Sequence, residues 1–488
     1  MSRKQLVSDT VVYGGTAVLR NAVGFFLLPI YTRVMHPDQY AGMDLVLAGS
    51  ALMSVLLDFQ LGPSANRFYR EHESGEQRRL FLGSIAVFRL WTAFLVAALA
   101  AFLAYRFGIG YLPPVQHGKL LWIIAVFTVP FSLTAELLFL YLRILEHRWL
   151  FITLSVVSAA TGGGLAVILL LWTAWGAAAV LMGQALGSAV ICLVIAILLR
   201  HELKPRFIPP GLRDVLWFAL PLLPGTMLGW IWGYSTRFYM ARKLPLSDIA
   251  IYALAMKVLI FISVIGVAFR AAFEPLSMKV LYEQENSSRA WYSSSFNLYA
   301  AVLILMGSLI SAAAKPLVAA LAPASYARAS SLVPLLTISS CILFAATSLN
   351  IGNDVAKKTW NWSLAMLAGV VVMAAVLVSL LPFLGVSAAA VAYLAGSIAQ
   401  IIVVFHTSQV SFRIPYEAGS LYAAMVAAAT LIVVNLFAGV YRFPPGGLES
   451  ADLATGTVGA WYILTPRDRV LLVSSGRRLV GAVRSVAR

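Results

Sequence analysis

The chain has 488 residues, of which 60% are hydrophobic and only 11% are charged, whereas about a quarter of the residues of a soluble domain carry charge. So long and so apolar a chain cannot bury its apolar surface in one water-soluble core, which excludes an ordinary soluble enzyme or binding protein. The formal net charge is +16 at pH 7. Its placement along the chain decides whether it indicates a nucleic-acid partner or a membrane topology.

Apolar runs of about 20 residues recur from near residue 10 to near residue 440, and each is long enough to cross about 30 Å of hydrocarbon as a helix. They do not alternate in polarity as the strands of a membrane barrel would. The sequence therefore predicts an all-α integral membrane protein of about 14 transmembrane helices. The expected spans are 10–31, 43–61, 80–105, 119–141, 150–172, 175–199, 215–237, 248–270, 291–313, 329–350, 361–382, 385–405, 418–440 and a short, weakly apolar 448–464.

Lysine and arginine are distributed unequally between alternate loops. With the N-terminus in the cytoplasm, 24 of them fall on the cytoplasmic side and 8 on the other, and four lie within helices. This bias predicts a cytoplasmic N-terminus, and it accounts for most of the net charge without a nucleic-acid partner. The C-terminal arginines join the cytoplasmic set only if 448–464 spans the membrane, which favours fourteen helices over thirteen.

Two segments that begin six helices apart resemble each other. Both 31–45 and 235–254 contain a Thr-Arg pair, then Pro and Asp, then the start of an apolar helix. An even number of intervening helices gives two halves with the same orientation, a common transporter architecture with the cargo path between them. The predicted domains are a six-helix lobe at 1–212, a second at 213–412, and a C-terminal helix or helix pair with a basic cytoplasmic tail at 413–488.

Four cations lie within the expected helices, where an ionisable group is costly and usually faces a cavity or a partner. Arg20, Arg89 and Lys257 are about ten residues into their helices, near the bilayer midplane, and Arg237 lies nearer an outer end. One interpretation is a hydrated, net-positive central cavity that binds a phosphate or diphosphate group, because guanidinium forks match phosphate oxygens.

Acidic residues in the same helices support a second interpretation, in which the charges pair and hold helices together. The candidates for such pairing, or for coupling to an ion, are Asp44, Asp58 and Glu136. Pairing of Arg89 with Glu136 is one example, and Asp44 and Arg237 are close enough to helix ends to reach the interface. The residues alone leave both interpretations open.

The seventh expected helix combines prolines at its start with a stripe of glycines. Pro221 and Pro224 free backbone carbonyls and permit bending. Gly225, Gly229 and Gly233 recur every four residues and form a flat face that another helix could approach closely. The pattern fits either a helix that bends during transport or static tight packing.

Motifs of catalytic and metal sites are absent. The sequence has no G-x-x-x-x-G-K-[ST] loop for ATP, no H-E-x-x-H, no paired C-x-x-C and no G-x-S-x-G. Its only cysteines, Cys192 and Cys341, lie in apolar runs and are expected to be buried apolar residues. We therefore expect no enzyme activity, no catalytic residue, no cofactor and no metal site.

Several motifs resemble the polysaccharide transporter (O-antigen flippase) family of the MOP superfamily, which also contains the MATE exporters and the lipid II flippases. The segments similar to that family are 27–33 (LLPIYTR), 37–46, 60–69, 236–239 (TRFY) and 247–257. The chain departs from the family pattern at 441–464, which is less apolar than a normal terminal helix pair.

The resemblance implies a MATE-like, V-shaped fold of two six-helix lobes and a C-terminal helix pair. It also implies a flippase of the bacterial inner membrane that moves undecaprenyl-diphosphate-linked oligosaccharide for O-antigen or exopolysaccharide synthesis by alternating access. Arg20, Arg237 and Lys257 match the cationic residues of the family's central cavity by placement, and Arg89 joins them as a cavity candidate because of its depth in its helix. Membrane lipids and polysaccharide polymerase or assembly proteins would be its partners.

Three other functions stay open at this point. A MATE-type multidrug exporter would need acids to bind organic cations, whereas the midplane residues here are predominantly positive. A membrane-embedded glycosyltransferase or polysaccharide polymerase would be expected to hold part of its sugar site in a large external loop, and the external loops here are short. A scaffold for a polysaccharide synthase complex would not depend on the cations.

Overall fold

The computed structural model describes residues 22–107, 118–204, 206–207, 209, 211–283, 285–437 and 447–464. All regular structure within these residues is helical. Twelve helical segments are long and apolar enough to cross a membrane, and a shorter apolar helix covers Ala22–Val34. The prediction of an all-α, multi-pass membrane protein is therefore confirmed. The part of the first expected helix that contains Arg20 lies outside the described residues.

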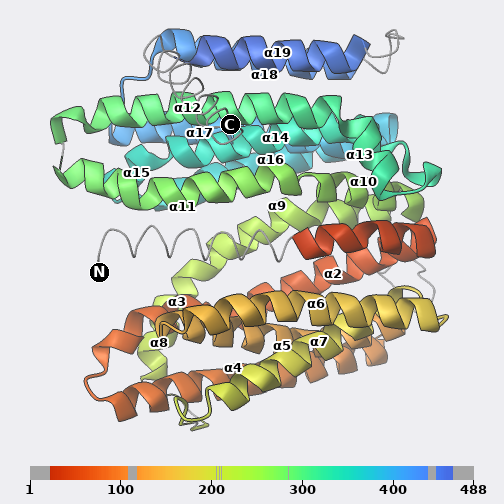
Figure 1. Cartoon of the computed structure of the whole chain (residues 1–488), viewed down its shortest axis with the longest axis vertical. Helices are drawn as coiled ribbons and strands as arrows, with labels where there is room; N and C mark the ends of the chain where they lie inside the picture. The colour runs from red at the N-terminus through yellow and green to blue at the C-terminus, as the bar shows by residue number, and fades with distance from the viewer. Residues whose placement is uncertain are drawn as a thin grey trace, which may run out of the picture. The chain divides into compact units, whose positions relative to one another are not determined.

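The helices follow the expected spans closely, and most extend a few residues beyond them (Figure 1). Their bounds are α2 Pro37–Asp58, α3 Leu61–Phe68, α4 Gly75–Phe107, α5 Gly118–Ile144, α6 Arg148–Trp172, α7 Ala177–Leu198, α8 Leu212–Ala219, α9 Leu223–Ala241, α10 Leu246–Val258, α11 Ile260–Glu283, α12 Glu285–Ala312, α13 Ala314–Leu321, α14 Ala329–Leu349, α15 Ile351–Val355, α16 Trp360–Leu384, α17 Ser387–Ser411, α18 Ala418–Phe437 and α19 Gly447–Ile463.

The chain forms two compact units. Unit 1 comprises Met1–Ala253 and Leu321–Tyr326, and unit 2 comprises Leu254–Ala320 and Ala327–Arg488. The boundary falls inside α10, so that α9 packs with unit 1, mainly against α2. The predicted lobes 1–212 and 213–412 rest on an internal repeat in the sequence, whereas the two units are defined by contacts. The lobe boundaries therefore stay a prediction.

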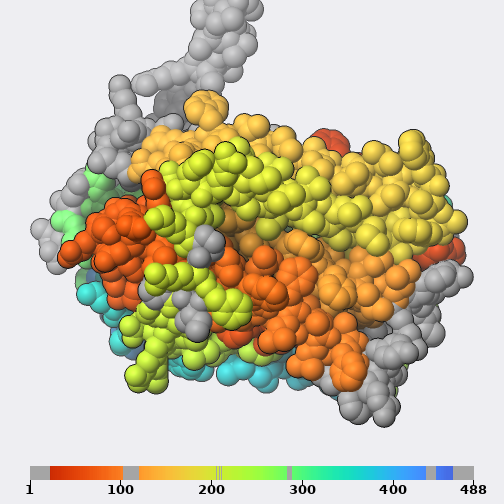
Figure 2. Space-filling model, turned by 90° about the horizontal axis from the view of Figure 1, so that it is seen from below, coloured from red at the N-terminus to blue at the C-terminus, as the bar shows by residue number. Residues whose placement is uncertain are grey.

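Unit 1 has its main core where α3, α4, α5, α6, α7 and α8 meet. Tyr141 of α5 is fully buried there and donates a hydrogen bond from its hydroxyl to the carbonyl oxygen of Leu82 on α4, at 3.0 Å. α6 and α7 instead carry many exposed large apolar side chains, among them Trp149, Leu171 and Leu193. The surface of these two helices is the gold-to-yellow band in Figure 2. Apolar exposure of this kind is expected where a helix faces lipid.

Unit 2 is built around α14, whose membrane-length window is 72% buried, a larger share than in any other candidate span. α12 and α17 flank it, and α16 packs along α17. Small hydroxyl side chains on α14, such as Ser339 and Ser340, donate hydrogen bonds to carbonyl oxygens one turn earlier in the same helix. These local bonds satisfy polar groups that would otherwise be costly to bury.

α19 is a regular helix that packs against α12 and α18, although its sequence is weakly apolar. Part of its polarity is satisfied by contacts within unit 2, and Asp452 Oδ2 has no hydrogen-bond partner among the described residues. Asp452 is buried and accepts a hydrogen bond from Asn435 of α18 at 2.9 Å, and Glu449 pairs with Lys315 of α13 at 3.1 Å. A Cβ on Gly456 would lie 2.3 Å from Ser308 Oγ, so the missing side chain permits a close approach to α12. Hydropathy underestimates the tendency of such a segment to form a packed helix, because it ignores the polar partners on neighbouring helices.

Two helices carry glycines four residues apart, Gly183 and Gly187 on α7 and Gly229 and Gly233 on α9, and their surroundings differ. On α7, a Cβ at Gly183 or Gly187 would lie 2.3–2.4 Å from backbone atoms of α6, so these glycines allow the two helices to touch. On α9, a Cβ at Gly229 or Gly233 would meet nothing within 4 Å. The interpretation that the α9 glycines allow tight packing is therefore wrong for Gly229 and Gly233 within the described residues. The helix does break near its prolines, where a short 3₁₀ turn at Leu220–Leu222 separates α8 from α9.

This contrast predicts different stability effects for the same substitution. Gly187→Ala forces α6 and α7 apart and is expected to cost about 1–3 kcal/mol, as overpacking commonly does. Gly229→Ala adds a methyl group in open space and improves helix propensity, so its unfolding temperature should equal or slightly exceed that of the wild type. Thermal unfolding of the purified protein in detergent measures both. Equal unfolding temperatures for the two variants would contradict the close α6–α7 contact.

Candidate functional site: paired charges in unit 1 and a polar cavity in unit 2

Helix α2 carries two carboxylates that pair with arginines from two other helices of unit 1. Asp44 and Asp58 are fourteen residues apart, almost four turns, and therefore lie on nearly the same face of α2. Asp44 pairs with Arg237 of α9, and Asp58 pairs with Arg89 of α4. Both arginines are buried. These four residues therefore fit the second interpretation of the sequence, in which opposite charges pair and hold helices together.

The Asp44–Arg237 pair lies in an aromatic, water-poor environment. Arg237 donates from Nε to Asp44 Oδ2 at 2.5 Å and from Nη1 to the Gly233 carbonyl oxygen at 2.5 Å. Its guanidinium carbon lies 5.3 Å and 5.5 Å from the ring centroids of Tyr234 and Tyr252. The carboxylate balances the charge, and the rings and the carbonyl satisfy the rest of the group. Arg237 therefore does not reach the interface by snorkelling.

The Asp58–Arg89 pair lies where α2 breaks before α3. Arg89 is 2% exposed and donates to Asp58 Oδ1, and Gln60 Nε2 donates to the other oxygen of the same carboxylate at 3.2 Å. The proposed pairing of Arg89 with Glu136 is wrong, because Asp58 approaches Arg89 from a helix that the sequence did not place beside it. Phe59 and Gln60 both have positive φ at this break, which turns the chain so that Gln60 can join the pair.

Glu136 on α5 is exposed, and so is Lys257 on α10. Nine residues, or two and a half turns, separate Glu136 from the exposed Phe127, so the two lie on opposite faces of α5. If the Phe127 face meets lipid, Glu136 points elsewhere. Lys257 is the penultimate residue of α10, two residues before the interruption at Leu259 that separates α10 from α11. Of the sequence-predicted site residues, Arg20 alone lies outside the described structure.

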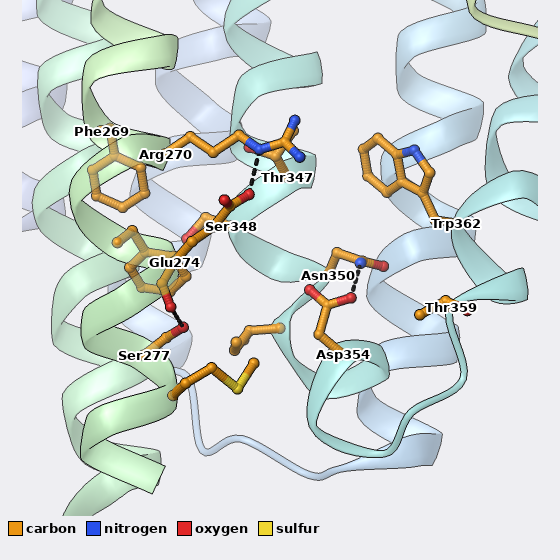
Figure 3. Close-up of a pocket in the computed structure, with 13 residues that line it drawn as sticks. Phe269, Arg270, Glu274, Ser277, Thr347, Ser348, Asn350, Asp354, Thr359 and Trp362 are labelled. Carbon is orange, nitrogen blue, oxygen red and sulfur yellow. Dashed lines mark hydrogen bonds and ion pairs between the residues drawn. The ribbon is translucent and has the colours of Figure 1, made fainter. Parts of the chain in front are cut away.

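Unit 2 contains a polar cavity of about 460 Å³ that the sequence did not predict. Figure 3 shows Arg270 and Glu274 reaching into it from α11, Asn350 and Asp354 from the end of α14 and from α15, and Trp362 from α16 on the opposite side. Arg270 pairs with Glu274 one turn away at 2.5 Å, and Asn350 donates to Asp354 at 2.9 Å. These residues looked like ordinary polar helix ends in the sequence. The sequence signal for this cavity is weak. It consists of Glu274 and Asp354, two acids near helix ends that are expected on the same side of the membrane.

A network of amides supports the α15 side of this cavity. The buried Asn353 donates to Asn350 Oδ1 at 3.0 Å and to Thr407 Oγ1 at 3.1 Å, and it accepts from Asn361 at 2.8 Å. These bonds join α14, α15, α16 and α17, so Asn350 and its neighbour Asp354 are held in a fixed orientation. Within unit 2 the cavity is a candidate functional site, and nothing in its donor set requires a cofactor or metal.

Comparisons with known proteins identify relatives of the chain. A profile of the family described as polysaccharide biosynthesis protein matches residues 6–281. A solved structure of the lipid II flippase MurJ in an inward closed conformation is similar over 95% of this chain and 100% of that chain, with a TM-score of 0.71 and 12% identity. No curated protein matches.

MATE transporters have a similar fold as well. An inward-facing multidrug resistance MATE transporter of the MOP superfamily matches with a TM-score of 0.57 and 13% identity, over 81% of this chain and 94% of that chain. A point mutant of the Vibrio cholerae MATE transporter VcmN matches with a TM-score of 0.52 and 14% identity, over 84% of this chain and 95% of that chain. The family and the fold are therefore those that the sequence motifs indicated.

The buried pair in unit 1 predicts a specific pattern of stability changes. Asp44→Asn should destabilise the protein by about 3–5 kcal/mol, because it leaves the Arg237 charge buried without a counter-charge. Adding Arg237→Gln to Asp44→Asn should recover a large part of that loss. A double-mutant cycle by thermal or denaturant unfolding measures the coupling. The exposed pair Arg270–Glu274 is the matched control, with an expected coupling below about 1 kcal/mol. Equal coupling in the two cycles would refute the distinction.

Proposed function

We propose that this chain, which belongs to the family of polysaccharide biosynthesis proteins, is a flippase for undecaprenyl-diphosphate-linked oligosaccharide. The chain is a multi-pass membrane protein whose fold is similar to those of the lipid II flippase MurJ and of MATE transporters. The observation that carries the proposal is the exposed cation Lys257 in a helix of this fold. The cargo would feed a surface polysaccharide such as O-antigen or exopolysaccharide.

The depth of Lys257 makes it a candidate for contact with an anionic lipid head group. It lies eleven residues after the start of α10 at Leu246, roughly 16 Å along the helix axis and so about halfway across the hydrocarbon. An ammonium group exposed to lipid at this depth would be costly, so the side chain is expected to face water or an anion. We assign the diphosphate group to Lys257 and to Arg20, which is expected at a similar depth.

The other two predicted cavity cations have a different proposed role. Arg237 and Arg89 are buried, and Asp44 and Asp58 already balance their charges. A diphosphate would have to displace a bound carboxylate to reach either of them. We therefore propose that both arginines position α2 against α9 and α4, and that they do not bind cargo. The exposed Glu136 is the remaining candidate for ion coupling.

A MATE-type exporter of organic cations is the second candidate, favoured by the exposed acid Glu136 and by the MATE folds among the solved structures. The polysaccharide family and the flippase fold over 95% of the chain favour the first. The loop charges support a cytoplasmic N-terminus, and the resemblance to the O-antigen flippases supports a location in the bacterial inner membrane. Alternating access, with polymerase or assembly proteins as partners, completes the proposal.

Substitution of the exposed cation tests the proposed function in cells. Lys257→Ala is expected to lower surface polysaccharide by about tenfold or more, because one charge-assisted contact to phosphate is worth roughly 1.5–3 kcal/mol. Lys257→Arg should retain most activity, and Lys243→Ala, which removes an exposed cation from the loop before α10, should retain all of it. Surface polysaccharide is measured against the amount of protein in the membrane.

The outcome that contradicts the flippase proposal is normal polysaccharide in both Lys257→Ala and Arg20→Ala cells with wild-type protein levels. Overproduction of the wild-type chain separates the rival function. Increased resistance to organic cations that depends on Glu136, together with unaffected polysaccharide, would identify an exporter.

A further inference from the structure

The cavity in unit 2 is confined to one end of that unit. Its walls come from the second half of α11, the last turn of α14, α15 and the first turn of α16. Lys357 and Lys358 lie in the loop at this end, which the loop charges assign to the cytoplasmic side. A cargo that enters from the cytoplasm would meet this end of unit 2 first.

The α11 side of the cavity is backed by stacked aromatic rings. Phe269 stacks on Tyr299 of α12 with ring centroids 3.6 Å apart, and on Phe273 at 5.1 Å. Phe273 in turn stacks on Trp291 at 5.7 Å. Phe269 and Phe273 belong both to this stack and to the cavity lining. A wall locked by four rings holds the polar side chains of α11 in place and offers apolar surface beside them.

The charges of the lining do not suit a phosphate. The lining has one cation, Arg270, and two acids, Glu274 and Asp354. Arg270 is already paired with Glu274, so a diphosphate would meet a carboxylate without gaining a free guanidinium. The cavity is therefore complementary to a neutral or weakly cationic molecule.

The remaining polar groups of the lining are hydroxyls and an amide. Ser277, Thr347, Ser348 and Thr359 supply hydroxyls, and Asn350 supplies the amide. Ser277 Oγ and Thr347 Oγ1 donate to carbonyl oxygens of their own helices, so toward a ligand these two hydroxyls act as acceptors. Ser348 is 2% exposed, and its Oγ has no hydrogen-bond partner among the described residues. A buried hydroxyl without a partner is costly. Because Ser348 lines the cavity, we expect a polar ligand or a water molecule there to form the missing hydrogen bond with its hydroxyl.

Carboxylates, an amide and hydroxyls beside aromatic rings form a surface that matches a sugar, which has hydroxyls around its edge and apolar C–H groups on its faces. The volume of about 460 Å³ lies in the range of small-molecule sites. We infer that this cavity binds sugar units of the cargo, with Trp362 against a sugar face and Glu274 and Asp354 accepting from sugar hydroxyls. The inference rests on the proposed flippase function and separates the sugar site of unit 2 from the diphosphate site at Lys257.

Binding measurements on the purified full-length protein in lipid nanodiscs test this division of the cargo. The two probes are undecaprenyl diphosphate and the same lipid carrying its oligosaccharide, extracted from the producing cells. The wild type is expected to bind the glycolipid about tenfold more tightly than the bare lipid. Trp362→Leu and Glu274→Gln should lose this preference and keep wild-type affinity for the bare lipid.

Trp360→Leu is the matched control, because Trp360 is an exposed tryptophan two residues away on α16 that does not line the cavity. It should retain the tenfold preference. Thermal unfolding of each variant verifies that it is folded, and Glu274→Gln, at an exposed side chain, tests the inference even if Trp362→Leu unfolds.

Four results would overturn the inference. An unchanged preference in folded Trp362→Leu and Glu274→Gln, or a wild type that binds both lipids equally, would place no sugar site here and leave the flippase proposal intact. Glu274-dependent binding of tetraphenylphosphonium without any effect of Glu274 on glycolipid binding would make the cavity a cation site. A wild type that binds neither lipid would overturn the proposed function itself.

Discussion

An ionised side chain inside an apolar helix bundle must find a counter-charge or water, and this constraint organises unit 1. α2 supplies two carboxylates on one face, and α4 and α9 each supply an arginine that is buried against one of them. The pairs fix which helices lie beside α2. They also remove Arg89 and Arg237 from the set of charges available to a ligand. Glu136 of α5 in unit 1 is left exposed, and so is Lys257 of α10, which belongs to unit 2.

Unit 2 satisfies its polar groups by other means. Serines of α14 bond to their own helix, amides around Asn353 join four helices, and α19 pairs its acids with neighbouring helices. Other polar groups, among them Glu274, Ser348 and Asp354, gather in one cavity at the end of the unit. A flippase must handle a lipid tail, a diphosphate and a sugar chain, which have different chemistry. In the proposed function, the cavity gives the sugar a polar environment whose lining does not include Lys257.

Much of the fold could be predicted from the sequence, because helix length and apolarity are local properties. The spans from α2 to α18 follow directly from apolar runs. Pairing could not be predicted, since it depends on which helices are neighbours. Arg89 and Glu136 both lie at membrane depth, which makes them one possible pair in the sequence, yet Asp58 is the partner of Arg89 in the structure.

The sequence could not show which side chains and glycines are buried either. Regular spacing of Gly229 and Gly233 on α9 suggested tight packing, but these positions face open space, whereas Gly183 and Gly187 on α7 do touch α6. The cavity of unit 2 was missed for a related reason. Its residues come from helix ends that are far apart in the chain, such as Glu274 and Trp362, and each alone is typical of a membrane interface.

The account depends most on Lys257 facing water at bilayer depth. Its most direct test is the reaction of a Lys257→Cys variant with a charged, membrane-impermeant methanethiosulfonate reagent, since thiols react as thiolates and need water to ionise. The native Cys192 and Cys341 are buried, and Val371→Cys, at an exposed apolar position in α16, provides a lipid-facing control. The account predicts rapid labelling of Cys at 257 and little at 371. Labelling at 257 as slow as at 371, in folded protein, would contradict it.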